Sequence, residues 1–285
     1  MNSARHFDQL AVCLFGVSLF FGPSQKLLAQ GKPSDTIEVR RESGYSADAK
    51  VGSYGQPEWT AHRHFATSRT YVIPEGTLAF ESWAKIHRYK DGTFNDTLLR
   101  QEIEYGLTNR LQLDLYVNQI NEVRDGKRVW DTEGVQYEVR WAMADWGQLP
   151  ANPTWYLEYH WVKNAPEKAE VRLLLADNLA PAWHYSINAG YEIELWGEER
   201  ERELIATAAV GTTSLFPTLS IGAEIKREWV DTKDNRGHMQ GETMIGPSFN
   251  WRPVRWAHLD VAPLFGLEED APRNEVWLIA GAELK

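Results

Sequence analysis

Strict alternation of apolar and polar side chains is the feature that most limits how this chain can fold. The stretch 111–118 reads LQLDLYVN, with an aliphatic residue at every odd position and a polar or amphipathic residue at every even position. On a helix these two sets would scatter around the axis, whereas on a strand they separate onto opposite faces. The stretch is therefore predicted to be a β-strand with one apolar and one polar face.

The same pattern recurs from residue 76 to the end of the chain. We expect twelve strands, at 76–89, 97–107, 109–119, 132–145, 154–163, 168–176, 183–196, 202–213, 217–229, 240–251, 255–265 and 274–284. Most exceed the usual strand length of about 5–6 residues and suit the roughly 9–11 residues with which a tilted strand crosses a bilayer. The predicted fold class is all-β, an antiparallel up-and-down transmembrane β-barrel of about 12 strands, an even number as in bacterial barrels.

Tryptophan placement favours a membrane barrel over a soluble β protein. A lipocalin-like barrel or a lectin-like sandwich would alternate equally well, with its apolar face inside. Nine tryptophans lie at or near predicted strand ends: Trp141, Trp146, Trp155, Trp161, Trp183, Trp196, Trp229, Trp251 and Trp256. Such rings prefer the headgroup level of a bilayer and form girdles around membrane barrels, whereas a soluble core would place them at strand centres.

The connections differ between the two ends of the predicted barrel. On the side of the N-terminus they are mostly short or proline-containing, at 107–109, 145–153, 177–182, 214–217 and 251–255. On the other side they are more charged, at 119–132, 197–202, 229–240 and 266–274. Short periplasmic turns and longer polar external loops are typical of outer-membrane barrels, so we expect the N-terminus on the periplasmic side.

The N-terminal part of the chain shows no strand pattern. Arg5 precedes the apolar stretch Leu10–Gly22, and small residues follow near Ala29. This predicts a signal peptide at 1–29, because the apolar stretch is shorter than the about 20 residues of a membrane helix. Residues 30–75 are polar and lack a period, which predicts a periplasmic arm or partial plug, with the barrel at 76–285. Cleavage would remove Cys13, the only cysteine.

Polar side chains in the middle of the predicted strands are candidates to line the lumen. They are Arg100, Glu102, Glu104, Asp114, Tyr116, Glu138, Arg140, Glu158, His160, Arg172, Glu192, Glu194 and Glu224. A lumen can hold these groups because opposite charges on neighbouring strands pair along the wall, although a solvated outer surface would also tolerate them. Eight of them are acidic and three are arginines, so a conducting pore should prefer cations or neutral solutes.

Catalytic and cofactor motifs are weak in this sequence. The pairs Glu102/Glu104 and Glu192/Glu194 each share a strand face, but nothing distinguishes a general acid from a nucleophile, as glycoside hydrolysis requires. The histidines show no metal-ligand spacing beyond His62-x-His64. The formal net charge of −10 argues against nucleic acid as a partner. We expect a protein that is not an enzyme and has no cofactor.

The segment 100–118, RQEIEYGLTNRLQLDLYVN, resembles a hairpin of the outer-membrane barrels associated with meta-pathway phenol degradation and often described as transporters. The segments 246–249 (GPSF) and 264–267 (LFGL) are similar to that family's closing strands. The resemblance implies an outer-membrane channel or transporter for small molecules, including aromatic or hydrophobic ones. The expected partners are outer-membrane lipid, a small-molecule solute and the barrel-assembly machinery. The alternative from another class is a soluble exported β-sandwich or barrel that binds or hydrolyses carbohydrate.

Overall fold

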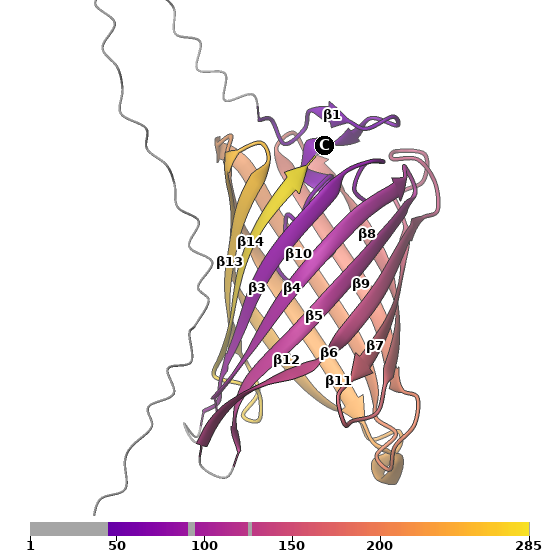
Figure 1. Ribbon diagram of the computed structural model, residues 1–285. Coiled ribbons are helices and arrows are strands. Elements are labelled where there is room, and N and C mark those ends of the chain that lie inside the picture. The colour runs from indigo at the N-terminus through magenta and orange to yellow at the C-terminus, as the bar shows by residue number, and fades with distance from the viewer. Residues whose placement is uncertain (1–44, 91–94, 125–126, 285) are drawn as a thin grey trace, which may run out of the picture. The chain divides into compact units, whose positions relative to one another are not determined.

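The computed structural model describes residues 45–90, 95–124 and 127–284, and these form a closed β-barrel with part of the chain inside it (Figure 1). The expected signal peptide at 1–29 lies outside the described residues. The barrel strands are β3 (Leu78–Arg88), β4 (Asn95–Thr108), β5 (Leu111–Arg124), β6 (Lys127–Ala142), β7 (Thr154–Val162), β8 (Lys168–Ala180), β9 (Trp183–Glu194), β10 (Arg202–Phe216), β11 (Leu219–Asp231), β12 (Gln240–Val254), β13 (Ala257–Gly266) and β14 (Asn274–Leu284). Before them come β1 (Lys50–Val51), β2 (Gln56–Pro57) and a 3-10 turn, η1 (Glu58–Thr60). Among these residues, no helix is long and apolar enough to cross a membrane.

Each barrel strand pairs antiparallel with the next one along the chain, and β14 closes the ring by pairing with β3. The prediction of a 12-strand antiparallel barrel is confirmed. We call the end where β3 begins and β14 finishes the near end, and the opposite end the far end. The near-end connections are short between most strands, as between Phe216 and Leu219 or Val254 and Ala257. Short connections fit the antiparallel order because they can join only neighbouring strands.

The outer face of the barrel is apolar. On β5, Leu113, Leu115 and Val117 are 41%, 38% and 42% exposed, whereas Gln112 and Tyr116, which alternate with them, are fully buried. Other strands present exposed apolar residues in the same way, among them Phe80, Ile103, Tyr137, Leu157, Ile187, Leu204, Ile225, Ile245, Phe249, Leu259 and Leu278. A large exposed apolar band around a polar interior is the arrangement of a barrel that sits in lipid. The chain is therefore a transmembrane barrel with the architecture of outer-membrane barrels.

Most of the tryptophans proposed for the girdles do face outward. Trp141, Trp155, Trp161, Trp183, Trp196, Trp251 and Trp256 are exposed. Trp146 differs, because its ring packs edge-on against Trp59 and Tyr71, with centroids 5.9 and 5.2 Å away. It belongs to a near-end connection that folds over the lumen and not to the lipid-facing wall. Trp229 is half-buried, 5.0 Å from the guanidinium carbon of Arg227.

The predicted long loop at 119–132 is wrong. Strands β5 and β6 continue through it as a paired ribbon that ends with Arg124 opposite Lys127 (Figure 1). Polar residues such as Asn121 and Arg128 interrupt the alternation on which the prediction rested, although the two strands remain paired there. The ribbon is stabilised by a cross-strand hydrogen bond from Arg128 to Asn121 at 2.7 Å. At the near end, β8 similarly extends to Ala180, so the predicted 177–182 connection is shorter.

Residues 45–77, which we call the inner segment, enter the barrel at the near end. Every residue from Gln56 to Pro74 is buried. The segment contacts widely separated strands: Trp59 donates to Asn178 of β8 at 2.8 Å, Thr67 to Glu224 of β11, and the Ile73 amide to Gln112 of β5 at 2.8 Å. Because β3 starts at the near end, the chain must pass into the lumen and return. Gly106 allows this return, since a Cβ there would lie 2.2 Å from the Pro74 carbonyl oxygen.

Candidate functional site

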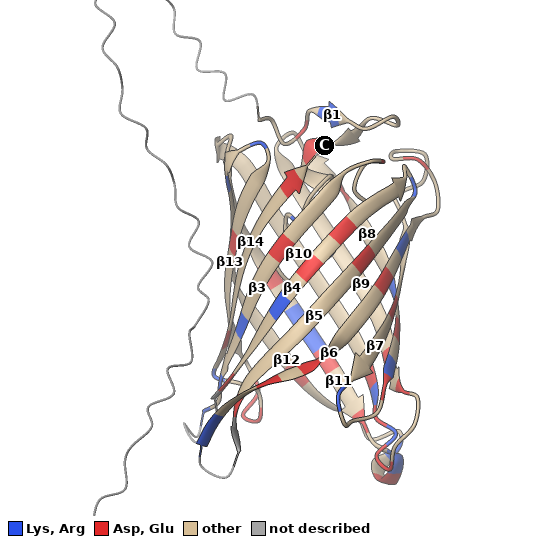
Figure 2. Cartoon of the chain, viewed as in Figure 1, with Lys and Arg blue, Asp and Glu red and all other residues tan. Residues whose placement is uncertain are grey.

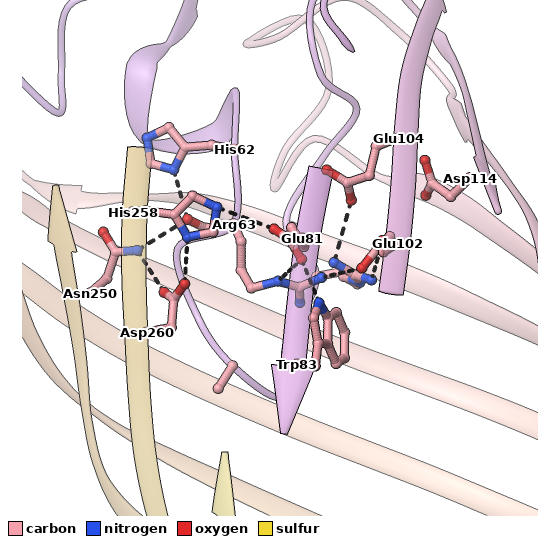
Figure 3. A network of polar contacts seen from close by, with 12 residues as sticks. His62, Arg63, Glu81, Trp83, Glu102, Glu104, Asp114, Asn250, His258 and Asp260 are labelled. Atoms are coloured by element: carbon pink, nitrogen blue, oxygen red, sulfur yellow. Dashed lines mark hydrogen bonds and ion pairs between the residues drawn. The ribbon is translucent and has the colours of Figure 1, made fainter. Parts of the chain in front are cut away.

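The lumen contains a buried network of arginines and carboxylates where the inner segment meets β3 and β4 (Figure 3). Arg63 of the inner segment donates to Glu81 at 2.7 Å and to Glu102 at 3.2 Å. Its guanidinium carbon lies 3.9 Å from the ring centroid of Trp83, whose indole N–H donates to Glu81 at 2.8 Å. A buried charge is tolerated only with partners such as these. Figure 2 shows that charged residues interrupt several strands and do not lie only in the connections.

Two further arginines extend this network toward β5 and β6. Arg69 of the inner segment donates to Glu102 at 3.0 Å and to the Tyr116 hydroxyl at 2.8 Å. Arg140 of β6 lies 3.0 Å from Asp114 and 3.4 Å from Glu104. The planar guanidinium group can bridge several carboxylates at once because its donors point in fixed directions. Two arginines of the inner segment thus neutralise carboxylates that the barrel wall provides.

The irregular backbone of the inner segment is held by side chains of the wall. The Glu224 carboxylate accepts the amide N–H groups of Ala66 at 2.9 Å and Thr67 at 2.7 Å. Asn188 of β9 accepts from the Arg69 amide at 2.7 Å and donates to the Arg69 carbonyl at 2.8 Å. Backbone polar groups without a strand partner need such acceptors and donors when buried. The lumen wall therefore fits this segment specifically.

Histidines gather at the near end of the lumen. His62 lies 3.3 Å from the Tyr45 hydroxyl and its ring is 6.2 Å from that of His258. His64 lies 3.3 Å from the Ser220 hydroxyl and 5.1 Å from the His184 ring. Burial is the main cause that holds the pKa of both His62 and His64 well below the ordinary histidine value, because a charged ring would lose its water. Burial thus favours the neutral form of both rings.

Three groups of carboxylates within the described ranges bring their oxygens close enough to share a cation. They are Glu81/Glu102/Glu104, Glu102/Asp114/Glu138 and Glu192/Glu201/Glu203. The first two already contain the guanidinium groups of Arg63, Arg69 and Arg140. In the third, the Lys168 ammonium donates to Glu192 at 2.9 Å and to Glu201 at 3.0 Å. Protein cations therefore occupy the places that a metal ion would take, and neither His62 nor His64 joins any of the three groups.

A polar cavity of about 190 Å³ lies in the lumen, on the far-end side of the inner segment. Thr67 of the inner segment contributes to its lining, together with β3, β4, β6 to β11 and β14. Its aromatic lining residues are Tyr156 and Trp277, and its charged ones are Lys85, Arg100, Glu158, Glu170, Arg172, Glu192, Glu203, Lys226 and Glu228. A second cavity, of about 330 Å³, lies at the near end between Glu58, His62, Arg252 and Trp256. The inner segment contributes residues to both cavities.

The candidate lumen residues from the sequence divide into two sets. Nine are buried: Glu102, Glu104, Asp114, Tyr116, Glu138, Arg140, Glu158, His160 and Glu224. Arg100, Arg172, Glu192 and Glu194 are half-buried, and the first three of these line the 190 Å³ cavity with Glu158. Glu194 instead accepts the amide of Glu201 in a far-end connection, at 3.0 Å. Most of the candidates thus contact the inner segment or line the cavity, whereas Asp114 joins the network through Arg140 and His160 is buried on β7.

Several residues of the lumen were not among the sequence candidates. Arg63 and Arg69 lie in a segment without strand periodicity, which gave no hint of their partners. Glu81 and Lys85 alternate with Phe80, Ser82 and Ala84. Trp83 lies between them on the same strand face, and its apolar ring hid the polar character of that face in the sequence pattern. The signal that would have found them is the strand register itself, because β3 pairs Glu81 with Glu102 of β4.

Comparison with known proteins supports the fold and gives no family. No family model matches the sequence, and no curated protein matches it. An outer membrane channel from Pseudomonas putida F1 is similar in structure, with a TM-score of 0.56, 11% identity, and coverage of 75% of this chain and 97% of that one. The NanC porin has a TM-score of 0.51 and 12% identity, and the match covers 73% of this chain and 99% of that one. The β domain of the Bordetella autotransporter Brka has a TM-score of 0.50 and 8% identity, and the match covers 73% of this chain and 98% of that one. The fold is shared with outer-membrane channels and porins.

Proposed function

We propose that this chain is a non-enzymatic outer-membrane channel for small solutes, with its near end in the periplasm and its lumen closed by the inner segment. The observation that carries the proposal is the pair of cavities in a polar, charged lumen, one on each side of a single removable segment. Their volumes are about 190 and 330 Å³. Displacement of the inner segment would join them into a continuous aqueous path, because it contributes lining residues to both.

The inner segment has the character of a gate and not of a wall strand. It makes no strand ladder with the barrel, which closes without it. Many of its contacts to the wall are hydrogen bonds and ion pairs, whose partners water can replace when the segment leaves. Trp59, Phe65, Ala66, Tyr71 and Val72 add apolar contacts to the wall.

The finer part of the proposal concerns the solute and the family. We propose small molecules with an aromatic or apolar body, carried by a member of the phenol-degradation barrels that the 100–118 hairpin resembles. The aromatic side chains of the lumen support this, since Trp83 and Trp277 lie with their rings 5.8 Å apart and line a small niche of about 40 Å³ beside the larger cavity. Indole faces bind both apolar groups and cations.

The alternative of a soluble carbohydrate-binding or hydrolysing protein fits these observations less well. Its outer face should be polar, whereas this barrel exposes apolar residues to its surroundings. The carboxylate pairs that suggested hydrolysis are also occupied: Glu102 by Arg63 and Arg69, and Glu192 by Lys168. A general acid with a raised pKa needs a carboxyl group that faces substrate.

Conductance of the mature protein in planar bilayers tests the proposal. The wild type should show rare conducting events, and a variant without residues 45–75 should conduct continuously at a much higher level. Heat-modifiable migration on a gel shows whether the deletion variant has folded as a barrel. A folded deletion variant that carries no current, and admits no sugar in a liposome-swelling assay, would contradict the channel proposal.

A further inference from the structure

Most charged side chains of the 190 Å³ cavity already have partners. Arg172 donates to Glu170 at 2.9 Å, and Lys226 lies 3.0 Å from Glu228. Lys168 pairs with Glu192, and Glu158 accepts hydrogen bonds from Tyr156 at 2.5 Å and Gln136 at 2.8 Å. Among the described residues that line this cavity, Arg100, Glu158 and Glu203 lack an ion pair, and Glu158 has the two hydrogen bonds just given. Arg100 and Glu203 remain as the charged groups of interest.

Arg100 of β4 has spare hydrogen-bonding capacity toward the cavity. Its Nε donates to the Asn118 side chain at 2.9 Å. Its guanidinium carbon lies 5.1 Å from the Trp83 ring and 4.8 Å from the Tyr116 ring, which fixes the group between two aromatic faces. The terminal nitrogens have four N–H donors and no carboxylate partner among the residues described. A planar guanidinium held in this way is suited to bind a carboxylate with two parallel hydrogen bonds.

Lys85 of β3 adds a second positive charge beside Arg100. Its ammonium lies 3.7 Å from Glu275 and 5.2 Å from the Trp277 ring centroid. Glu275 is shared, because it also accepts from Lys226 at 3.0 Å and from His87 at 2.7 Å. Lys85 and Arg100 therefore form a basic pole of the cavity.

Glu203 of β10 lies in an acidic pole. Its strand partner in the register is Glu192 of β9, and Glu228 of β11 also lines the cavity. Lys168 and Lys226 pair with these two neighbours, so one carboxylate remains in excess. A small ligand ammonium would relieve the repulsion among the three carboxylates.

The two poles face each other across the lumen. In the ring of twelve strands, β4 and β10 stand six positions apart, which makes them diametrically opposite. Both Arg100 and Glu203 line the same cavity, with Trp277 in its wall. A cavity this small holds only a small solute, since ordinary ligand pockets have about 300–1,000 Å³.

We propose that this cavity binds small zwitterionic solutes, with the carboxylate at Arg100 and Lys85, the ammonium at Glu203, and the hydrocarbon body beside Trp277. The inference deepens the proposed function by naming the polar groups of the solute, but binding here requires no conduction. Opposite charges on opposite walls favour a ligand whose two charges stand at its two ends. A solute with only one of these charges would leave one pole without a partner.

The test is calorimetric titration of the full mature protein in detergent with three probes of equal carbon number: 4-aminobutanoate, butanoate and butylammonium. The five- and six-carbon series extend the comparison to longer separations of charge. In at least one series the zwitterion should bind at least about tenfold more tightly than either singly charged probe. This is the difference expected for one additional polar contact. Equal binding of the zwitterion and one singly charged probe in every series, or no binding at all, overturns the proposal.

Two variants identify the poles. Arg100→Gln should weaken binding of the zwitterion and of the alkanoate and leave alkylammonium binding unchanged. Glu203→Gln should weaken binding of the zwitterion and of the alkylammonium and leave alkanoate binding unchanged. Lys163→Gln is the matched control, because Lys163 is an exposed far-end lysine that pairs with Asp131 and does not line the cavity. Heat-modifiable migration verifies folding of each variant. A barrel that binds the zwitterion but never conducts would contradict the channel proposal alone, whereas a conducting barrel without this binding pattern would contradict only the present inference.

Discussion

Glu224 of β11 holds Thr67 of the inner segment through two hydrogen bonds, from the backbone amide at 2.7 Å and from the hydroxyl at 2.6 Å. The same carboxylate accepts the amide of Ala66 at 2.9 Å. All three donors lie in one turn, at the place where the inner segment borders the far-end cavity. One wall carboxylate therefore fixes the deepest part of this segment.

Replacement of Glu224 should release the inner segment. Glu224→Ala leaves three buried donors without an acceptor, and hydrogen bonds to a charged group each contribute about 1.5–3 kcal/mol. We expect the conducting fraction in single-channel recordings to rise about tenfold or more. Glu192→Gln is the control, since Glu192 pairs with Lys168 and not with the inner segment. An unchanged conducting fraction in Glu224→Ala would show that this contact does not hold the segment closed.

The barrel could be predicted from the sequence, whereas the site could be predicted only in part. Each strand carries its own evidence, because lipid requires an apolar residue at every second position, as at Leu113, Leu115 and Val117. The polar partners on the same strands, such as Glu102 and Asp114, follow from that alternation. The inner segment carries no such evidence, because its backbone bonds to side chains of the wall and imposes no period. Arg63 and Arg69 therefore could not be assigned to Glu81 and Glu102 before the three-dimensional structure was known.

Acidification should loosen the inner segment through His62 and His64. Burial lowers the pKa of both, and Arg252 lowers it further. His258 also lowers the pKa of His62 while Glu81 opposes this, and His184 lowers that of His64. A displaced segment would expose both rings with a pKa of about 6.5.

The docked segment thus binds fewer protons than the displaced one, so docking is unaffected above about pH 6.5 and loses stability as the pH falls below it. We expect the conducting fraction to rise as the pH is lowered from 7.5 to 5. The double variant His62→Gln/His64→Gln should show a flatter response. A wild-type response that is flat, or that the double variant leaves intact, would exclude these two histidines as its cause.

Removal of the inner segment should make the pore more selective for cations. Deletion of residues 45–75 removes Arg63 and Arg69, which neutralise Glu81 and Glu102 in the intact chain. Uncompensated carboxylates in a narrow lumen concentrate cations. Under a salt gradient, the reversal potential of the deletion variant should lie closer to the equilibrium potential of the cation than that of the wild type in its conducting events. A shift toward the anion potential would contradict this account of the lumen charge.

Leu113 should be sensitive to charge because it faces the lipid. It is 41% exposed on β5, between the buried residues Gln112 and Asp114. Leu113→Arg should lower the free energy of unfolding in lipid vesicles by about 2–4 kcal/mol if the residue is near the midplane. Leu113→Met provides the control of similar size. Equal stability of the two variants in urea titrations would place this face of β5 away from the lipid.

The central claim, that the inner segment gates the lumen, is tested most directly by a reversible cross-link. Ser68 of the inner segment donates to Thr207 of β10 with 2.7 Å between their hydroxyl oxygens, so S68C/T207C brings two thiols within reach of a disulfide. Cys13 is the only native cysteine and lies in the expected signal peptide, and S68C alone is the matched control. In planar bilayers, the oxidised double variant should show no conducting events and should recover them after reduction. The S68C variant should conduct equally after oxidation and after reduction. Continued conduction by the oxidised, fully cross-linked protein would contradict the claim.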